Sequence, residues 1–135
     1  MLSISFHLSV ARLLRTERFY RDGLGVASTR VGSYEDGYLI IQPQDASWEI
    51  IIKPWEKSYE EFPDLYAREK LPEEAGKGVK LNFLVANVDA VLQQACLFGG
   101  RPVSEPKNTS ENERIAALTD PDGYLILLTG PVPEE

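Results

Sequence analysis

An internal repeat constrains the fold of this chain more than any other feature of its 135-residue sequence. A shift of 75 residues (81 minus 6) places residues 6–11 on residues 81–86 and Gly25 on Gly100. In each half, alternating apolar residues predict a strand, and a helical pattern follows that ends at the glycine. Three successive elements in one register indicate duplication of a single supersecondary unit, and neither half is long enough to bury a core alone.

The first predicted strand, residues 3–10, has two different faces because successive side chains of a strand point in opposite directions. The side chains expected to face a core are Phe6, Leu8 and Val10. The side chains expected on the other face are Ser5, His7 and Ser9.

Each half continues with a helix and three further strands, separated by turns rich in glycine and proline. Helices are predicted over residues 13–22 and 88–98, and Asn87 is positioned to cap the second. The sequence Asp-Pro-Asp-Gly at 120–123 predicts a tight turn. The remaining predicted strands cover residues 26–31, 37–42 and 48–53, then 79–85, 101–105, 114–119 and 124–128.

The predicted fold class is therefore α+β, with two tandem βαβββ modules whose curved sheets form a cleft. We place module 1 at about residues 1–54 and module 2 at about residues 79–135, within a single domain. Residues 55–78 are the predicted linker, with mixed charge and two prolines, and a short helical turn is expected near residues 65–70.

Composition narrows the possible partners and the compartment. The net charge of −7, from 21 acidic and 14 basic residues, disfavours binding to nucleic acid. No apolar run approaches the roughly 20 residues that span a bilayer, and no signal-peptide pattern is visible. The single cysteine, Cys96, cannot form an internal disulfide. We expect a cytoplasmic protein with no membrane or nucleic-acid partner.

Two segments carry a resemblance to a known superfamily. Residues 17–25, ERFYRDGLG, and residues 120–128, DPDGYLILL, resemble the helix end and the final hairpin of the vicinal oxygen chelate superfamily. This superfamily includes glyoxalase I, bleomycin-resistance proteins and extradiol dioxygenases. The resemblance covers nearly the whole chain and implies paired βαβββ modules around a small-molecule cleft. It also implies a homodimer, with the linker near the interface.

The resemblance further implies four positions for metal ligands. The first-strand positions are Ser5 in module 1 and Lys80 in module 2, and the last-strand positions are Glu49 in module 1, matched to Leu127 in module 2. A divalent cation needs several imidazole or carboxylate donors, and only Glu49 supplies one. A shifted set that recruits His7 and Asn82 still provides only two credible donors, His7 and Glu49. The sequence therefore predicts no metal and no cofactor.

Several residues remain candidates for ligand binding or catalysis. His7 is interpreted either as a general base or as a histidine hydrogen-bonded in a polar interior without chemistry. Lys80 and Glu49 are expected to form an ion pair across the cleft, or to contact a polar ligand. The candidate catalytic residues are His7 and Glu49. The candidate ligand contacts are Ser5, His7, Glu49, Lys80, Asn82, Leu127 and Trp55.

The two tryptophans are interpreted mainly as packing residues. Trp48 has the opposite strand parity to Glu49 and is predicted to lie in the core. Trp55 follows Pro54 in the linker, where it would pack or flank the cleft or the dimer interface.

The favoured functional hypothesis is a metal-free protein that binds, and thereby sequesters, a small drug or metabolite. The alternative is a lyase or isomerase that uses His7, Glu49 and Lys80 without metal. A metal-dependent lyase or dioxygenase rests on family likeness alone.

Overall fold

The computed structural model describes residues 4–61 and 79–134, which contain two four-stranded sheets. Sheet 1 has the strand order β1-β4-β3-β2 and sheet 2 the order β5-β8-β7-β6. The strands of sheet 1 are β1 (Ile4–Val10), β2 (Thr29–Val31), β3 (Tyr38–Ile41) and β4 (Trp48–Pro54). The strands of sheet 2 are β5 (Lys80–Leu84), β6 (Arg101–Asn108), β7 (Glu113–Thr119) and β8 (Leu125–Pro131).

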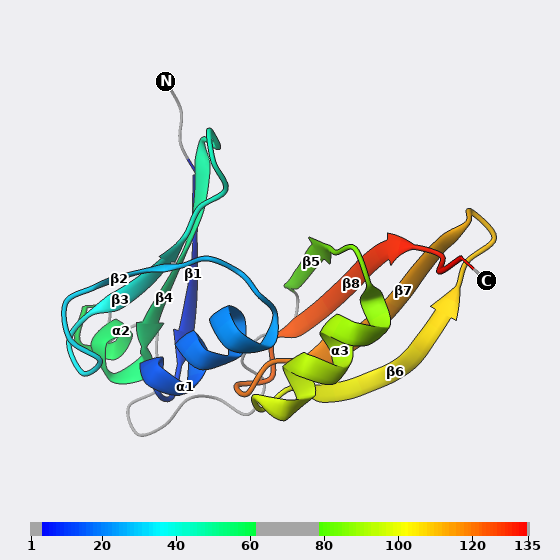
Figure 1. The fold of residues 1–135 in the computed structure, drawn as a ribbon. Coiled ribbons are helices and arrows are strands. Elements are labelled where there is room, and N and C mark those ends of the chain that lie inside the picture. The colour runs from blue at the N-terminus through cyan, green and yellow to red at the C-terminus, as the bar shows by residue number, and fades with distance from the viewer. Residues whose placement is uncertain (1–3, 62–78, 135) are drawn as a thin grey trace.

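The two sheets share one topology (Figure 1). In each sheet the first strand pairs parallel with the last, and the other neighbours pair antiparallel. A helical segment follows the first strand in both cases. In sheet 1 it is α1 (Leu13–Arg18) with its continuation η1 (Phe19–Gly23), and in sheet 2 it is α3 (Val88–Leu97). The α+β fold with a repeated unit, predicted from the sequence, is confirmed.

The predicted starts of the helices agree with the structure better than their predicted ends. Asn87 caps α3 as predicted, because its Oδ1 accepts a hydrogen bond from the Ala90 N–H at 3.0 Å. The first helix does not run as one α-helix over residues 13–22. Its last turn widens into η1, where the Leu24 N–H donates to the carbonyl of Phe19, five residues earlier, at 2.9 Å.

One helix was not predicted. Helix α2 (Trp55–Glu61) begins inside the stretch assigned to the linker and packs on β4 and β1. The helical turn predicted near residues 65–70 lies outside the described residues. None of the helices that the structure describes is long and apolar enough to cross a membrane.

A single core joins both modules. It lies between the helices and the sheet faces that they cover, and η1 packs directly against α3. Phe19 and Tyr20 in η1 are fully buried, and the Tyr20 ring lies 6.4 Å from the ring of Phe83 in β5. The fully buried strand residues are Val10, Leu39 and Ile52 in sheet 1 and Leu118, Ile126 and Leu128 in sheet 2.

Two residues predicted to lie in the core are instead exposed. Leu8 and Val10 are buried as expected, but Phe6 is 49% exposed and Trp48 is 39% exposed. The cause is the position of α1, which starts at Leu13 and covers only one end of the strands. No described helix covers the other end of this face, where Phe6 and Trp48 lie.

Strand β6 is longer than predicted. It runs to Asn108 although it contains Pro102 and Pro106, and its pairing with β7 shifts register twice. Strand β6 is the edge of sheet 2, so one side of its backbone pairs with no other strand. A proline nitrogen on that side costs the sheet no hydrogen bond.

Candidate functional site

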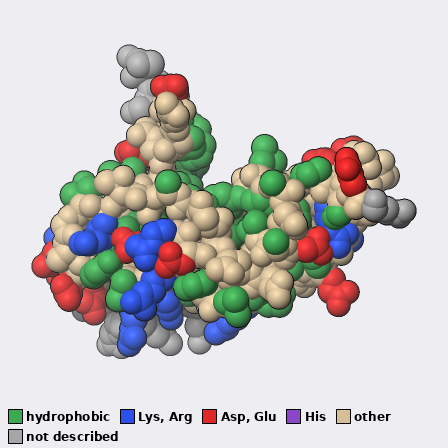
Figure 2. Space-filling view, viewed as in Figure 1, with side chains coloured by type: hydrophobic (Ala, Val, Ile, Leu, Met, Phe, Trp, Pro, Cys, Tyr) green, Lys and Arg blue, Asp and Glu red, His purple; other side chains and the backbone are tan. Residues whose placement is uncertain are grey.

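A groove of about 800 Å³ opens between one end of sheet 1 and the edge strand of sheet 2. Its first wall is the uncovered end of β1 and β4, and its second wall is β5. In Figure 2, hydrophobic side chains lie along the hollow between the upright end of sheet 1 and sheet 2. We call this hollow the groove.

The first wall follows from strand pairing. Strands β1 and β4 run parallel with Ile4 opposite Trp48 and Phe6 opposite Ile50, so all four side chains share one face. The rings of Phe6 and Trp48 meet edge to face, with their centroids 6.3 Å apart. The result is an aromatic surface that faces the groove.

The second wall is the free edge of sheet 2. Leu84, at the end of β5, is 81% exposed, and Val79, just before β5, is 38% exposed. Lys80 and Asn82 line the same wall. The Asn82 Oδ1 accepts a hydrogen bond from the Thr129 Oγ1 at 2.9 Å, which holds the amide in one orientation.

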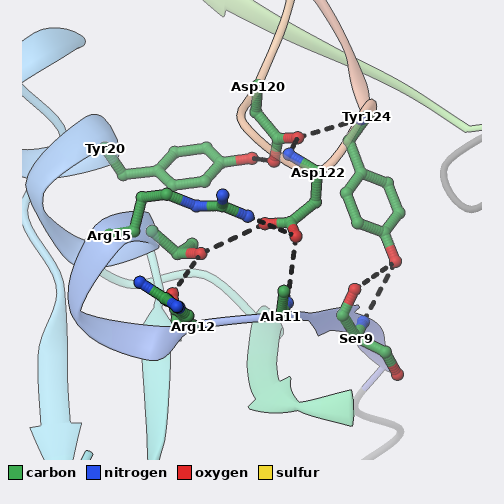
Figure 3. Close-up of polar contacts among 9 residues, drawn as sticks. Ser9, Ala11, Arg12, Arg15, Tyr20, Asp120, Asp122 and Tyr124 are labelled. Atoms are coloured by element: carbon green, nitrogen blue, oxygen red, sulfur yellow. Dashed lines mark hydrogen bonds and ion pairs between the residues drawn. The ribbon is translucent and has the colours of Figure 1, made fainter. Parts of the chain in front are cut away.

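A polar junction joins the two sheets at the C-terminal end of β1, away from the groove (Figure 3). It consists of Ser9 and Ala11 from module 1 and of Asp122 and Tyr124 from module 2. The Tyr124 hydroxyl donates to the Ser9 carbonyl and accepts from the Ser9 N–H, both at 3.0 Å. The Asp122 Oδ1 accepts from the Ala11 N–H at 2.9 Å. These contacts fix the end of β1 against the turn between β7 and β8.

Two further side chains strengthen the junction. Arg15 forms an ion pair with Asp122 at 2.9 Å, and the Asp122 side chain is only 2% exposed. The Thr16 Oγ1 lies 3.4 Å from the Asp122 Oδ2. Because Asp122 accepts from backbone and side-chain donors together, its buried carboxylate is well satisfied.

A second carboxylate of the same turn lies deeper. The Asp120 Oδ2 accepts from the Tyr20 hydroxyl, and its Oδ1 accepts from the N–H groups of Asp122 and Tyr124. Burial raises the pKa of Asp120, although these hydrogen bonds act in the opposite direction. Burial also raises the pKa of Tyr20, and the Asp120 charge adds to the rise.

The residues predicted from the family likeness do not line one cavity. Ser5, His7 and Glu49 lie on the outer face of sheet 1, the face turned away from α1. There the Ser5 Oγ donates to the Glu49 Oε1 at 3.2 Å, and His7 is exposed. Helix α2 covers one end of this face, where the Oγ atoms of Ser9 and Ser58 are 3.0 Å apart. Of the predicted contacts, only Lys80 and Asn82 line the groove.

The predicted ion pair between Lys80 and Glu49 is wrong. Glu49 bonds to Ser5 on sheet 1, whereas Lys80 is on sheet 2 and forms no ion pair with any residue that the structure describes. The reason is topological. Glu49 lies on the face of sheet 1 turned away from α1, whereas Lys80 lines the groove, which is bounded by the opposite face of that sheet.

Strand register also corrects the correspondence between the two modules. Ser5 lies opposite Glu49, and its repeat counterpart Lys80 lies opposite Leu125. The counterpart of Glu49 is therefore Leu125. Leu127, which was matched to Glu49, lies opposite Asn82. This position corresponds to Ile51, which lies opposite His7.

The donor set consequently fits a metal even less well than the sequence indicated. The position equivalent to Leu127 in module 1 is occupied by Ile51, which offers no donor atom. No group of three or more histidine, cysteine or acidic side chains is arranged to hold a metal within residues 4–61 and 79–134. The superfamily's metal chemistry has no support from these side chains.

Trp55 is buried rather than open to the groove. It is 6% exposed, and its ring stacks on Tyr59 with centroids 5.6 Å apart and an interplanar angle of 4°. Its indole Nε1 is buried and has no hydrogen-bond partner among the described residues. This position favours a packing role in α2.

Sequence reasoning missed the apolar wall and the junction. Ile4, Phe6, Trp48 and Ile50 were not considered as a site, although α1 begins too late to cover the start of β1. The turn at 120–123 was recognised, but its contacts cross more than 100 residues of sequence, from Asp122 to Ala11 and from Tyr124 to Ser9. No local pattern indicates such partners.

No family model matches the sequence, and no curated protein matches it. Solved structures, in contrast, match over nearly the whole chain. A glyoxalase-related enzyme from Fulvimarina pelagi has a TM-score of 0.74 at 16% identity, with 96% of this chain and 87% of that chain covered. This chain has the glyoxalase/bleomycin-resistance fold.

Two further neighbours share this fold. A glyoxalase/bleomycin resistance protein/dioxygenase family enzyme from Burkholderia phytofirmans PsJN has a TM-score of 0.69 at 15% identity, covering 95% of this chain and 97% of that chain. TnmS3, an antibiotic binding protein from Streptomyces sp. CB03234, has a TM-score of 0.63 at 22% identity, covering 98% of this chain and 97% of that chain. The fold expected from the resemblance is therefore confirmed.

Proposed function

We propose that this chain is a metal-free binding protein of the glyoxalase/bleomycin-resistance superfamily, and that it sequesters a small, largely apolar organic molecule in the groove. The volume of about 800 Å³ falls within the range of ligand pockets in proteins, roughly 300–1,000 Å³. The lining is mostly aliphatic and aromatic. Such a surface gains free energy when an apolar ligand displaces water from it.

The observation that carries the proposal is the gathering of exposed apolar side chains on the two walls of one groove. Phe6, Trp48 and Leu84 are 49%, 39% and 81% exposed. Ile4, at the start of the first wall, is 51% exposed. A contiguous exposed apolar surface typically marks an interaction site, because it stays costly until something covers it.

The fold neighbours are consistent with a binding role. One of them is described as an antibiotic binding protein, and others as glyoxalase-related proteins or enzymes. We assign no reaction to this chain. A metal-free lyase or isomerase would need His7, Glu49 and Lys80 around one substrate, whereas His7 and Glu49 lie on the outer face of sheet 1 and Lys80 lines the groove.

The direct test uses the neutral fluorescent dye phenylnaphthylamine, which brightens in apolar surroundings. We expect the protein to bind it, and we expect Phe6→Ala and Trp48→Ala to weaken binding by about tenfold each, as for loss of a buried aromatic contact. Leu97→Ala is the matched control, because Leu97 is 74% exposed on α3 and does not line the groove. Equal binding by all four proteins, or no binding at all, contradicts the proposal.

We also propose that the protein is a cytoplasmic homodimer, as expected for the superfamily. The alternative occupant of the groove is the partner subunit of that dimer. Light scattering at rising protein concentration, with dye binding measured alongside, distinguishes the two. If dimerisation expels the dye, the groove is a subunit interface and the binding proposal fails. If the dimer still binds the dye, both proposals hold.

A further inference from the structure

We infer that the molecule bound in the groove carries a negative charge beside a flat apolar body, and that Lys80 selects for that charge. This inference rests on the proposed binding function and specifies the class of ligand. It runs against the charge of the whole protein, which is −7 and would attract cations.

The first support is the charge of the lining. Of the described residues that line the groove, Lys80 is the only one with a charged side chain, and no carboxylate is present. The chain as a whole has 21 acidic and 14 basic residues, so a lining with one cation and no anion differs from the rest of the surface. The charge that the described residues bring to the groove lining is therefore positive.

The second support is the state of Lys80. Its ammonium forms no ion pair with a described residue. The arginines that approach carboxylates elsewhere are neutralised, as Arg15 is by Asp122 and Arg114 is by Asp89. The charge of Lys80 thus remains available to a ligand at the rim of an apolar surface, where water screens it less than on an open surface.

The third support is the polar neighbour of Lys80. Asn82 is two residues further along β5, so its side chain points to the same side of the sheet. The Asn82 Oδ1 is occupied by the Thr129 hydroxyl, which leaves the Nδ2 to donate. Lys80 and Asn82 together present donors, and this arrangement suits a carboxylate, sulfonate or phenolate oxygen.

The shape of the opposite wall completes the ligand class. The edge-to-face pair of Phe6 and Trp48 offers an aromatic surface across the groove from Lys80 and Asn82. Rings bind well against such a pair because of both area and ring electrostatics. An aromatic or polycyclic monoanion satisfies the two walls at once.

The experiment compares two dyes with the same ring system. Anilinonaphthalene sulfonate carries the negative charge, and phenylnaphthylamine lacks it. We expect Lys80→Met to raise the Kd of the anionic dye by about tenfold, because a charged hydrogen bond is lost. The Kd of the neutral dye should change less than twofold. Lys80→Arg should restore most of the affinity for the anion.

The matched control is Lys107→Met, which removes an exposed lysine on β6 outside the groove and should leave both Kd values unchanged. Raising the salt concentration should weaken the binding of the anionic dye but not the binding of the neutral dye. Circular dichroism confirms that the variants are folded.

The outcomes separate the two levels of inference. If neither dye binds the unaltered protein, the binding function itself is wrong. If both dyes bind and Lys80→Met affects neither or both equally, the groove binds ligands but Lys80 does not select an anion. Selective loss of the anionic dye supports the inference.

Discussion

The two modules repeat one topology, yet the contacts at their corresponding turns are opposite in character. By strand register, Trp48 in module 1 corresponds to Tyr124 in module 2, since each directly precedes the residues paired as Glu49 and Leu125. Tyr124 is 6% exposed and hydrogen-bonded to Ser9, whereas Trp48 is 39% exposed and faces the groove.

The residues that correspond to each other as partners of Tyr124 and Trp48 differ in the same way. Ser9, the partner of Tyr124, is buried. Its repeat counterpart is Leu84 (9 plus 75), which is 81% exposed. One end of the boundary between the sheets is closed by polar contacts, and the other end is open and apolar. Duplication of the module produced two equivalent boundaries between the sheets. Polar side chains close one of them as the junction, and apolar side chains leave the other open as the groove.

The largest expected effect comes from breaking the closed end. Asp122→Ala removes the acceptor for the Ala11 N–H and the partner of Arg15. We expect the free energy of unfolding to fall by about 2–3 kcal/mol, because the carboxylate's charge-assisted hydrogen bonds to the Ala11 backbone and to Arg15 are lost together. Urea denaturation measures the change. Asp36→Ala, at an exposed carboxylate in the turn before β3, serves as the control. A loss below about 0.5 kcal/mol would show that the turn does not hold the sheets together.

A smaller effect on stability is expected at Tyr124 and Trp48, the corresponding aromatic residues of the two modules. Tyr124→Phe removes one hydroxyl that bonds twice to Ser9, and should lower the free energy of unfolding by about 1–2 kcal/mol. Trp48→Phe, at the corresponding position, should change it by less than about 0.5 kcal/mol because Trp48 is partly exposed. Chemical denaturation of both variants checks the difference. Equal losses would mean that the two ends are energetically alike.

The smallest expected effect concerns pH. Burial raises the pKa of Asp120 above its unfolded value, so the folded state holds this proton more tightly. The contribution of Asp120 is fully present below the unfolded pKa of about 3.9 and is lost as the pH rises through the folded value. Asp120→Asn should therefore flatten the pH dependence of stability just above pH 4. Unfolding measured between pH 4 and 7 tests this, and parallel curves would contradict it.

The features predicted correctly from the sequence are those that depend on near neighbours. The strand β1, the Asn87 cap and the tight turn at 120–123 each follow from a few adjacent residues. The repeat added long-range information, because two copies of one pattern imply two copies of one topology. This was sufficient for the fold.

The candidate site was predicted less well because its residues depend on what covers them. Phe6 and Leu8 have the same strand parity, and only the starting point of α1 makes one exposed and the other buried. The match of Leu127 to Glu49 failed because a motif counted along the chain does not report which residues pair across strands. Helix α2 has no strong amphipathic pattern in its short sequence, so it was assigned to the linker.

The different surroundings of the two tryptophans give the protein a built-in optical reporter. Trp48 is partly exposed at the wall of the groove, while Trp55 is buried and stacked on Tyr59. A tryptophan near water emits at longer wavelength than a buried one, so the red side of the emission spectrum should come mainly from Trp48. Occupancy of the groove should shift or quench that part of the spectrum and leave the blue side unchanged. Unlabelled, colourless ligands can therefore be screened by the intrinsic tryptophan fluorescence of the protein.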